Sequence, residues 1–319
     1  MKKQFPLASI PVLILAAVSF AAPLLAQNAP PQSASSDLVR VTVTATARSG
    51  KVPPALQKID VSVHQDSRPR PVVDWIPENS PKASLDFVIL VDDSLNPQLG
   101  LQLRDMKDFI RSLPQNSRIA VAYAANGTAN MQQNFTTNRD AAEKALRLPV
   151  GAFQSSNGIY FALADLIKKW PKDVDRREVL LISDGIDLTY GVDESQPGSN
   201  PALDQAIGAA QRNNVTVYSL FASGAGMVAR NPFLVLNGQS CLGKLTLDSG
   251  GDSFFLGFQT PVSFRPYLQD LTKMLGQQYL LTFRAALPQK ASFHELKVST
   301  EMSGVELMAP SRIYLPARP

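Results

Sequence analysis

The sequence is poor in cysteine and histidine, on which disulfide scaffolds, zinc clusters and many active sites depend. It contains one cysteine, Cys241, and two histidines, His64 and His294, among 319 residues. A single cysteine excludes an internal disulfide and a zinc cluster built on thiolates. We expect Cys241 to be a small buried apolar residue. The long central part of the chain has no histidine, and we expect structural or surface roles for both histidines.

Charged residues are also scarce, at 18%, whereas hydrophobic residues make up 45%. This composition excludes a disordered polyelectrolyte, a collagen and a coiled coil. The net charge of +4 includes Lys2 and Lys3, which lie in a segment that we expect to be removed, so the mature chain carries about +2. So small a charge gives no strong attraction to nucleic acid, and we expect no nucleic-acid partner.

A long hydrophobic run occurs only near the N-terminus. Lys2 and Lys3 precede an apolar stretch at 10–22, and the small residue Ala26 follows it. This order is typical of a secretory signal peptide, and the stretch is short for a membrane span. We predict a signal peptide over residues 1–26 and a mature protein that has no stable membrane span and is exported to the periplasm or the extracellular space. The alternative is an uncleaved N-terminal anchor.

The middle of the chain alternates between strand and helix patterns. Continuous apolar runs at 87–91 and 179–182 are typical of strands buried on both faces, and we expect a third buried strand at 215–220. Between them, apolar residues recur at helical spacing, as in 103–113 and 159–170. Alternating strands and helices predict an α/β fold with a doubly wound, mostly parallel sheet and helices on both faces.

Both ends of the mature chain instead show strand patterns. A polar linker at 27–37 precedes the alternating segment 38–78, and strand patterns return over 278–319. Neither segment is long enough to bury a core alone. We therefore predict that the two segments pair into one small β-sandwich, into which the α/β domain at 84–277 is inserted.

Two glycine-bearing stretches suggest a nucleotide site, which their surroundings do not support. Residues 224–229 fit a dinucleotide pattern and follow a strand, but Pro232 would break the second turn of the helix which that pattern requires. Residues 238–244 nearly form a P-loop, but Leu245 stands where a Ser or Thr must hold magnesium. We expect no nucleotide cofactor.

Short oxygen-bearing side chains follow two of the buried strands. Asp92 and Ser94 come after the first strand, and Asp184 comes after the strand at 179–182. In an open α/β sheet, ligands bind beyond the carboxyl ends of the strands, where the strand order reverses. If the two strands flank that point, the three side chains face one crevice and suit a hard divalent cation.

The central segment resembles a von Willebrand factor type A (VWA) domain. The residues that carry the resemblance are FVILVDDSLN, IAVAYA, NGIYFALADLI, REVLLISDGID and VTVYSLFASG. In the order of its segments, the whole mature chain resembles an exported bacterial family related to these domains. The resemblance implies a Rossmann-like α/β sheet and a function in binding other proteins.

The resemblance also implies a metal-ion-dependent adhesion site (MIDAS). The family pattern is D-x-S-x-S, a Thr on a second loop and an Asp in the SDG segment. Asp92, Ser94 and Asp184 match it, whereas Asn96 replaces the second Ser and Asn157 stands at the Thr position. These five residues predict a degenerate MIDAS that binds one divalent cation, Mg, Mn or Ca, weakly. Without metal, Asn157 can cap a helix, Asn96 can open one, and Asp184 can hold a loop.

The function that the sequence favours is an exported, non-enzymatic protein-binding module of VWA type, with no catalytic residue and with a protein partner. Two alternatives remain open. One is a metal-free scaffold component of a cell-envelope assembly, which the altered ligands favour. The other is a hydrolase that depends on carboxylates alone, because the central domain has neither a histidine nor an intact P-loop.

Overall fold

The computed structural model describes residues 37–47, 52–151, 158–171, 173–174, 176–254 and 256–319. Contacts divide the chain into residues 1–34 and 35–319, and all described residues belong to the second unit. The predicted signal peptide, most of the predicted linker and Asn157 lie outside the described residues. Within the described ranges, no helix has the length and apolar character needed to cross a membrane.

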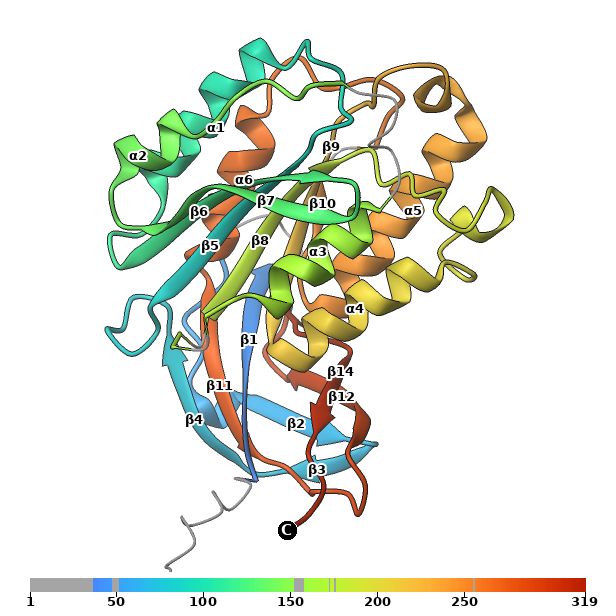
Figure 1. The fold of residues 1–319 in the computed structure, drawn as a ribbon. Helices are drawn as coiled ribbons and strands as arrows, with labels where there is room; N and C mark the ends of the chain where they lie inside the picture. Colours follow the sequence, from blue (N-terminus) through green and yellow to red (C-terminus); the bar gives the residue numbers. More distant parts are fainter. Residues whose placement is uncertain (1–36, 48–51, 152–157, 172, 175, 255) are drawn as a thin grey trace, which may run out of the picture. The chain divides into compact units, whose positions relative to one another are not determined.

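A six-stranded sheet with the order β10-β9-β8-β5-β6-β7 forms the centre of the α/β part (Figure 1). Five strands run parallel, and β7 is an antiparallel edge strand. The strands are β5 (Leu85–Asp92), β6 (Ser117–Ala125), β7 (Thr128–Thr136), β8 (Arg176–Ser183), β9 (Val215–Phe221) and β10 (Ser253–Phe254). Since β5 and β8 are apolar along their length and buried on both faces, the sheet needs a layer of helices on each side.

Helices cover both faces of this sheet. One apolar core joins the sheet to α1 (Gly100–Ser112), α2 (Arg139–Lys144) and α6 (Arg265–Leu275). A second core joins the opposite face to α3 (Ile159–Lys168), α4 (Pro201–Asn213) and α5 (Pro232–Ser249). Short 3-10 segments occur at η1 (Lys58–Asp60), η3 (Asp193–Ser195) and η4 (Val228–Arg230).

Strands from both ends of the chain form two four-stranded sheets, which we call the β-module. One sheet has the order β13-β1-β11-β4 and the other β14-β12-β2-β3. Its strands are β1 (Leu38–Ala47), β2 (Val61–Gln65), β3 (Arg68–Arg70), β4 (Val72–Pro77), β11 (Gln278–Arg284), β12 (Ser292–Thr300), β13 (Val305–Met308) and β14 (Arg312–Leu315). A third apolar core fills the space between the sheets. The structure thus confirms the predicted fold class, a doubly wound α/β sheet inserted into a β-sandwich of N- and C-terminal strands.

The sequence pattern did not predict α5, which is the longest helix in the described part of the chain. Glycines and short polar residues interrupt its apolar spacing. The structure explains Gly238, because a Cβ atom there would lie 2.3 Å from the carbonyl oxygen of Asp184. Residues 238–244, which nearly form a P-loop, lie inside this helix, and Pro232 occupies its first turn.

Two helix starts also differ from the expectations. The N-cap of α3 is Gly158, with a φ of 101°, whereas the predicted cap, Asn157, lies outside the described residues. Helix α1 begins at Gly100, four residues after Asn96. Asn96 instead accepts a hydrogen bond from the backbone N–H of Gln98 through its side-chain oxygen, at 3.0 Å. Cys241 is buried and free, as expected.

A buried polar network joins the α/β part to the β-module. Arg176 is fully buried at the start of β8, and its guanidinium donates to the Ala83 carbonyl at 3.0 Å and to the Gln278 side-chain oxygen at 2.5 Å. It also lies 3.5 Å from the carboxylate of Glu178. The Gln278 amide donates to the Tyr218 hydroxyl at 2.7 Å and to Thr44 at 3.3 Å.

Glu178 is the acidic member of this network. Burial raises the pKa of Glu178, and the nearby Arg176 cation counteracts part of that effect. A buried charge that loses its partner costs far more than a surface charge, because the remaining group stays out of water. The packing of the two parts therefore depends on a network of buried polar side chains centred on Arg176, Glu178 and Gln278.

We predict that Arg176→Met lowers the free energy of unfolding by about 3–5 kcal/mol, because it leaves Glu178 buried without its cation. Adding Glu178→Gln recovers a large part of the loss, since the uncompensated charge is then removed as well. Urea titration of the full chain measures both effects. Lys168→Met, at an exposed position of α3, serves as the control. An Arg176→Met variant as stable as the Lys168→Met control would contradict this role.

Candidate functional site at the carboxyl end of the sheet

The strand order places the switch point of the sheet between β5 and β8. From β5 the chain continues to β6 on one side, and it returns to β8 on the other. Asp92 ends β5 and Ser183 ends β8, so the residues after them lie where ligands bind in such sheets. We call the loops at this end of the sheet the crest: residues 92–99, 184–200, 222–231 and 256–264.

Asp92 is a buried carboxyl of the crest. One of its oxygens accepts the Ser94 backbone N–H at 3.0 Å and the Ser94 hydroxyl at 2.7 Å. The other oxygen accepts the Ser183 hydroxyl at 2.8 Å. Burial raises the pKa of Asp92, and these hydrogen bonds offset part of the rise.

Asp184 shares the crevice with Asp92. Its side chain accepts the Ile186 N–H at 2.9 Å, and a Cβ atom at Gly224 would lie 2.3 Å from its second oxygen. Burial, and then the charge of Asp92, raise the pKa of Asp184 to about 8. Within the described ranges, neither carboxyl makes an ion pair. The crevice therefore holds two acidic groups in a low-dielectric setting that disfavours charging both.

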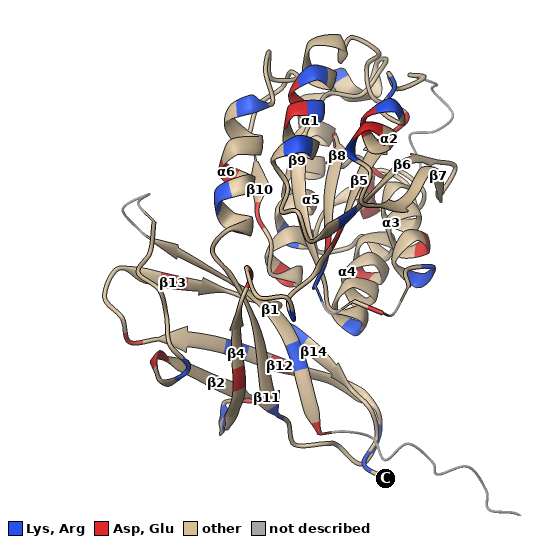
Figure 2. Ribbon diagram, turned by 90° about the vertical axis from the view of Figure 1, so that its left-hand side faces the viewer, with Lys and Arg blue, Asp and Glu red and all other residues tan. Residues whose placement is uncertain are grey.

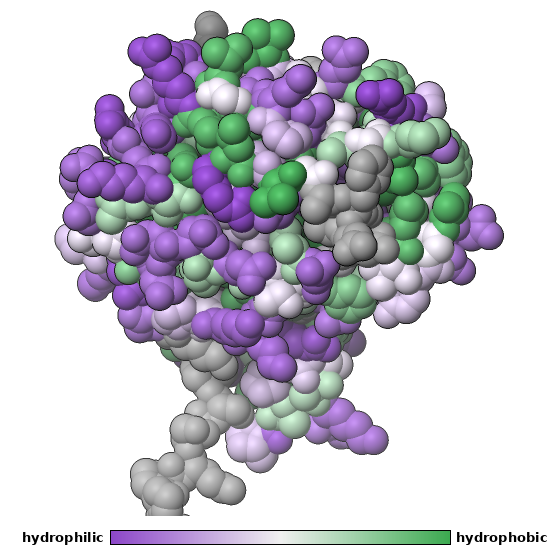
Figure 3. Space-filling model, turned by 45° about the horizontal axis from the view of Figure 1, so that its top comes forward, coloured by the Kyte–Doolittle hydropathy of each residue, from purple (hydrophilic) through white to green (hydrophobic). Residues whose placement is uncertain are grey.

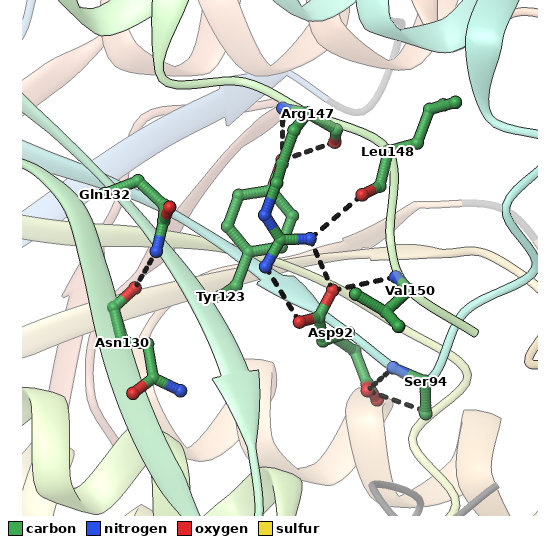
Figure 4. Close-up of polar contacts among 9 residues, drawn as sticks. Asp92, Ser94, Tyr123, Asn130, Gln132, Arg147, Leu148 and Val150 are labelled. Atoms are coloured by element: carbon green, nitrogen blue, oxygen red, sulfur yellow. Dashed lines mark hydrogen bonds and ion pairs between the residues drawn. The ribbon is translucent and has the colours of Figure 1, made fainter. Parts of the chain in front are cut away.

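Asp93, although adjacent to Asp92, has a structural role. The guanidinium of Arg147 pairs with both of its oxygens, at 2.7 and 2.8 Å, and the Val150 N–H donates to it at 3.0 Å. Arg147 also stacks on the ring of Tyr123, 3.9 Å from its centroid, as Figure 4 shows. These contacts hold the segment after α2 against β6, and the Arg147 cation balances the negative charge of Asp93.

Asn96 lies on a different side of the loop after β5. Its backbone N–H donates to the Ser223 carbonyl at 3.0 Å, while the Ser94 carbonyl accepts the Ala225 N–H at 2.9 Å. Asn96 lines a hollow of about 710 Å³ that none of Asp92, Ser94 and Asp184 lines. The structure therefore brings Asp92, Ser94 and Asp184 together, engages the Asn96 side-chain oxygen with the Gln98 N–H and does not describe Asn157.

Asp92, Ser94 and Asp184 supply enough negative charge for a divalent cation, but they are too few to fill its coordination shell. Asp92, Ser94 and Asp184 supply two carboxyls and one hydroxyl, and all three already make protein hydrogen bonds. Among the described residues there is no group of three or more His, Cys, Asp or Glu side chains suited to a metal. Magnesium takes about six oxygen ligands, so most of its shell would have to come from water or from a partner.

Two residues of the crevice were not singled out from the sequence. Ser183 holds Asp92, as described above. Asp187 is buried and accepts the Gly158 N–H at 3.2 Å and the Thr189 N–H at 2.9 Å. It thus ties the loop after β8 to the start of α3. The SDGID segment could have indicated Asp187, because its two carboxyls, Asp184 and Asp187, stand three residues apart in one tight loop.

Comparisons with known proteins give distant structural likenesses only. No protein-family model matches the chain, and a search of curated proteins gives no match. An aerotolerance-related membrane protein from Bacteroides fragilis is 13% identical, with a TM-score of 0.43, over 60% of this chain and 98% of that one. The SpRpn10 VWA domain is 14% identical, with a TM-score of 0.38, over 60% of this chain and 97% of that one.

The human COPII-coat protein Sec24c is 8% identical, with a TM-score of 0.38, over 73% of this chain and 44% of that chain. The description of the fold rests on the strand order and helix layers of this chain. A mostly parallel sheet of six strands, with an antiparallel edge strand and helices on both faces, is the architecture that the resemblance to VWA domains implied. The α/β part thus has the fold of a VWA domain.

We predict that Asp184 makes the folded chain less stable as pH rises. Its pKa is raised from 3.8 to about 8 on folding, so the folded state binds a proton more tightly than the unfolded state between these values. Stability then falls through this window, by up to about 1.4 kcal/mol per pH unit.

Denaturant titrations from pH 4 to pH 9 with a chelator present measure this slope. Asp184→Asn should flatten it, whereas Glu301→Gln, at an exposed position of the β-module, should leave it unchanged. Identical slopes for the natural chain and Asp184→Asn would show that the crevice does not hold a protonated carboxyl.

Proposed function

We propose that the α/β part of this chain is an exported, non-enzymatic protein-binding module of VWA type that receives a protein partner on its crest. The observation that carries the proposal is the apolar surface of the crest. Large exposed side chains gather on its loops and on the first turns of α1 and α5: Leu101, Tyr190, Val192, Met227, Phe233, Leu236, Leu256, Phe258 and Val262. Exposed apolar patches rimmed by polar residues mark interaction sites on soluble proteins.

The patch is exposed to a degree that folding alone does not explain. Met227 and Val262 are each 81% exposed, and Leu101 is 72% exposed. Figure 3 shows hydrophobic residues gathered on this face among polar ones. Three of these apolar residues, Leu101, Phe258 and Val262, line the hollow of about 710 Å³ together with Arg230 and the amides of Asn96, Gln98 and Gln259. A protein surface with apolar side chains and polar groups between them fits such a lining.

The charge of the molecule suits a protein partner rather than a polyanion. In the view of Figure 2, basic and acidic residues are interspersed over α1, α2 and α6. Several of them form surface pairs, such as Arg265 with Asp108 at 3.0 Å and Lys273 with Asp270 at 2.8 Å. Surface pairs of this kind reduce the net field that a nucleic acid would need.

A divalent cation in the crevice would be held by Asp92, Ser94 and Asp184. Bound there, it would neutralise two buried carboxyls and offer a coordination position to an acidic group of the partner. Its binding is weak, because the described protein donors are few. The alternative function, a metal-free scaffold component of a cell-envelope assembly, uses the same apolar patch without the cation. Export follows from the signal-peptide pattern of the first 26 residues.

We predict that charges placed in the crest patch abolish partner binding. Met227→Asp combined with Val262→Asp puts two carboxylates on the most exposed apolar positions, where burial against a partner would cost each charge its hydration. Leu247→Asp is the matched control, since Leu247 is also exposed, at 70%, but lies near the other end of α5.

Affinity capture from envelope extract, quantified by mass spectrometry, compares the three chains. A partner retained by the natural chain and by Leu247→Asp, but lost from the crest variant, supports the proposal. Equal capture by all three would rule the crest out as the binding surface.

We also predict that Asn96→Ser combined with Asn157→Thr strengthens magnesium binding. The two changes replace longer amides by the short hydroxyls of the family pattern, which suit the near-octahedral shell of magnesium. Adding Asp184→Ala removes the gain. Isothermal titration with magnesium and manganese measures this series. Tight magnesium binding by the natural chain, unchanged by the two hydroxyls, would mean that Asn96 and Asn157 are not ligands.

A further inference from the structure

A second polar constellation lies in the β-module, far from the crest in sequence and topology. Ser292 and His294 lie two residues apart on β12 and therefore share a face of that strand. The Ser292 hydroxyl is 2.9 Å from Nε2 of His294, and Nδ1 of His294 is 2.7 Å from the carboxylate of Asp66. A serine, a histidine and an aspartate are thus linked in series through the two ring nitrogens.

Asp66 is held rigidly in this position. It begins the two-residue turn between β2 and β3, where Asp66 and Ser67 both have positive φ, at 49° and 63°. Its backbone N–H donates to the Glu295 carbonyl at 3.1 Å, and its other carboxylate oxygen accepts the Glu295 N–H at 3.1 Å. The turn therefore presents the carboxylate to His294 from a fixed backbone.

The ionisation of Asp66 sets the tautomer of His294. Partial burial acts to raise the pKa of Asp66, but the hydrogen bonds from His294 and from the Glu295 N–H outweigh it and lower the pKa. An ionised carboxylate only accepts hydrogen bonds, so Nδ1 of His294 carries the proton. Nε2 then presents its lone pair to the Ser292 hydroxyl, which also donates to the Lys290 carbonyl at 3.1 Å. Turning the hydroxyl proton from that carbonyl to Nε2 gives the arrangement that a general base requires.

The strand geometry also leaves a backbone donor beside Ser292. The Leu296 N–H points to the β14 side, where it donates to the Ser311 carbonyl, and the Glu295 N–H points to the Asp66 side. By this alternation the Phe293 N–H points to the same side as Glu295. The pairing of β12 with β2 begins only at Leu296, so Phe293 lies beyond the end of β2 and its N–H has no ladder partner there.

The triad lies at the surface of the β-module, so an ester would reach it directly from solvent. The His294 side chain keeps 18% of its surface exposed and Asp66 keeps 48%, so the triad is reachable from solvent.

We propose that Ser292, His294 and Asp66 form a nucleophile–base–orienter triad that hydrolyses small carboxylic esters, with the Phe293 N–H as the oxyanion donor. The proposal concerns the β-module alone and is independent of binding at the crest. It gives His294 a role that the sequence did not indicate.

The chemistry is an ordinary acyl transfer. The Ser292 oxygen bonds to the ester carbonyl carbon while its proton passes to Nε2 of His294. The bond to the alcohol then breaks, and the alcohol leaves with that proton. Water attacks the acyl-serine, gives a proton to Nε2 and releases the acid, and the proton returns to Ser292. The sum is ester plus water giving acid plus alcohol.

A fluorophosphonate probe on the purified full chain tests the proposal directly, because such probes bond to activated serine oxygens with loss of fluoride. Mass spectrometry of the digested chain should find the label on Ser292. Labelling and p-nitrophenyl acetate hydrolysis should fall by about 100-fold or more in Ser292→Ala, His294→Gln and Asp66→Asn. Ser299→Ala, on the same strand, should match the natural chain, and so should the crest variant Met227→Asp with Val262→Asp.

Locating the label on the natural chain tests the proposal even if a variant fails to fold. No label on Ser292 would overturn the proposal. Label on Ser292 that is unchanged in folded His294→Gln and Asp66→Asn would also overturn it, since the serine would then react without its base and orienter. Thermal unfolding curves of each variant separate loss of reactivity from loss of fold.

Discussion

The buried guanidinium of Arg176 joins three parts of the chain that are far apart in sequence. It contacts the segment that enters β5 through Ala83, the strand β8 through Glu178, and the first residue of β11 through Gln278. A cation removed from water needs hydrogen-bond acceptors and a nearby carboxylate, which the two terminal nitrogens of Arg176 find in Ala83, Gln278 and Glu178. The insertion of the α/β part into the β-module therefore has a polar centre, and the apolar cores on either side of it fix the rest of the packing.

The position of the crest loops depends indirectly on the contacts of Arg176. Strand β8 carries Arg176 at its start and leads to Asp184 at its end, so the register that seats the guanidinium also sets the height of the loop after β8. Close backbone approach then holds that loop, because Gly238 and Gly224 leave room where any side chain would strike Asp184. The loops are closely packed against α5 and carry exposed apolar side chains, as expected of a preformed binding surface.

The sequence predicted most of the fold for physical reasons that can be named. Strands such as β5 and β9 are buried on both faces, so their apolar residues are easy to recognise in the sequence. Helix α5 was not predicted because a glycine such as Gly238 is required by close contact with the loop after β8 and interrupts the helical spacing of apolar residues. Site residues could be predicted only where they follow strand ends that the sequence itself reveals. Asp92, Ser94 and Asp184 follow strand ends, but the partner of His294 stands 228 residues away in the chain. No periodicity signals a contact of that kind.

The central claim is that a protein partner docks on the crest, and site-specific photo-crosslinking tests it most directly. A photoreactive amino acid at Val262 in the crest, or at Leu247 near the far end of α5, is activated in cells that export the full chain. The account predicts that the probe at position 262 forms a discrete crosslink to one protein and that the probe at position 247 does not. Crosslinks of equal yield from both positions, or from position 247 alone, would contradict it.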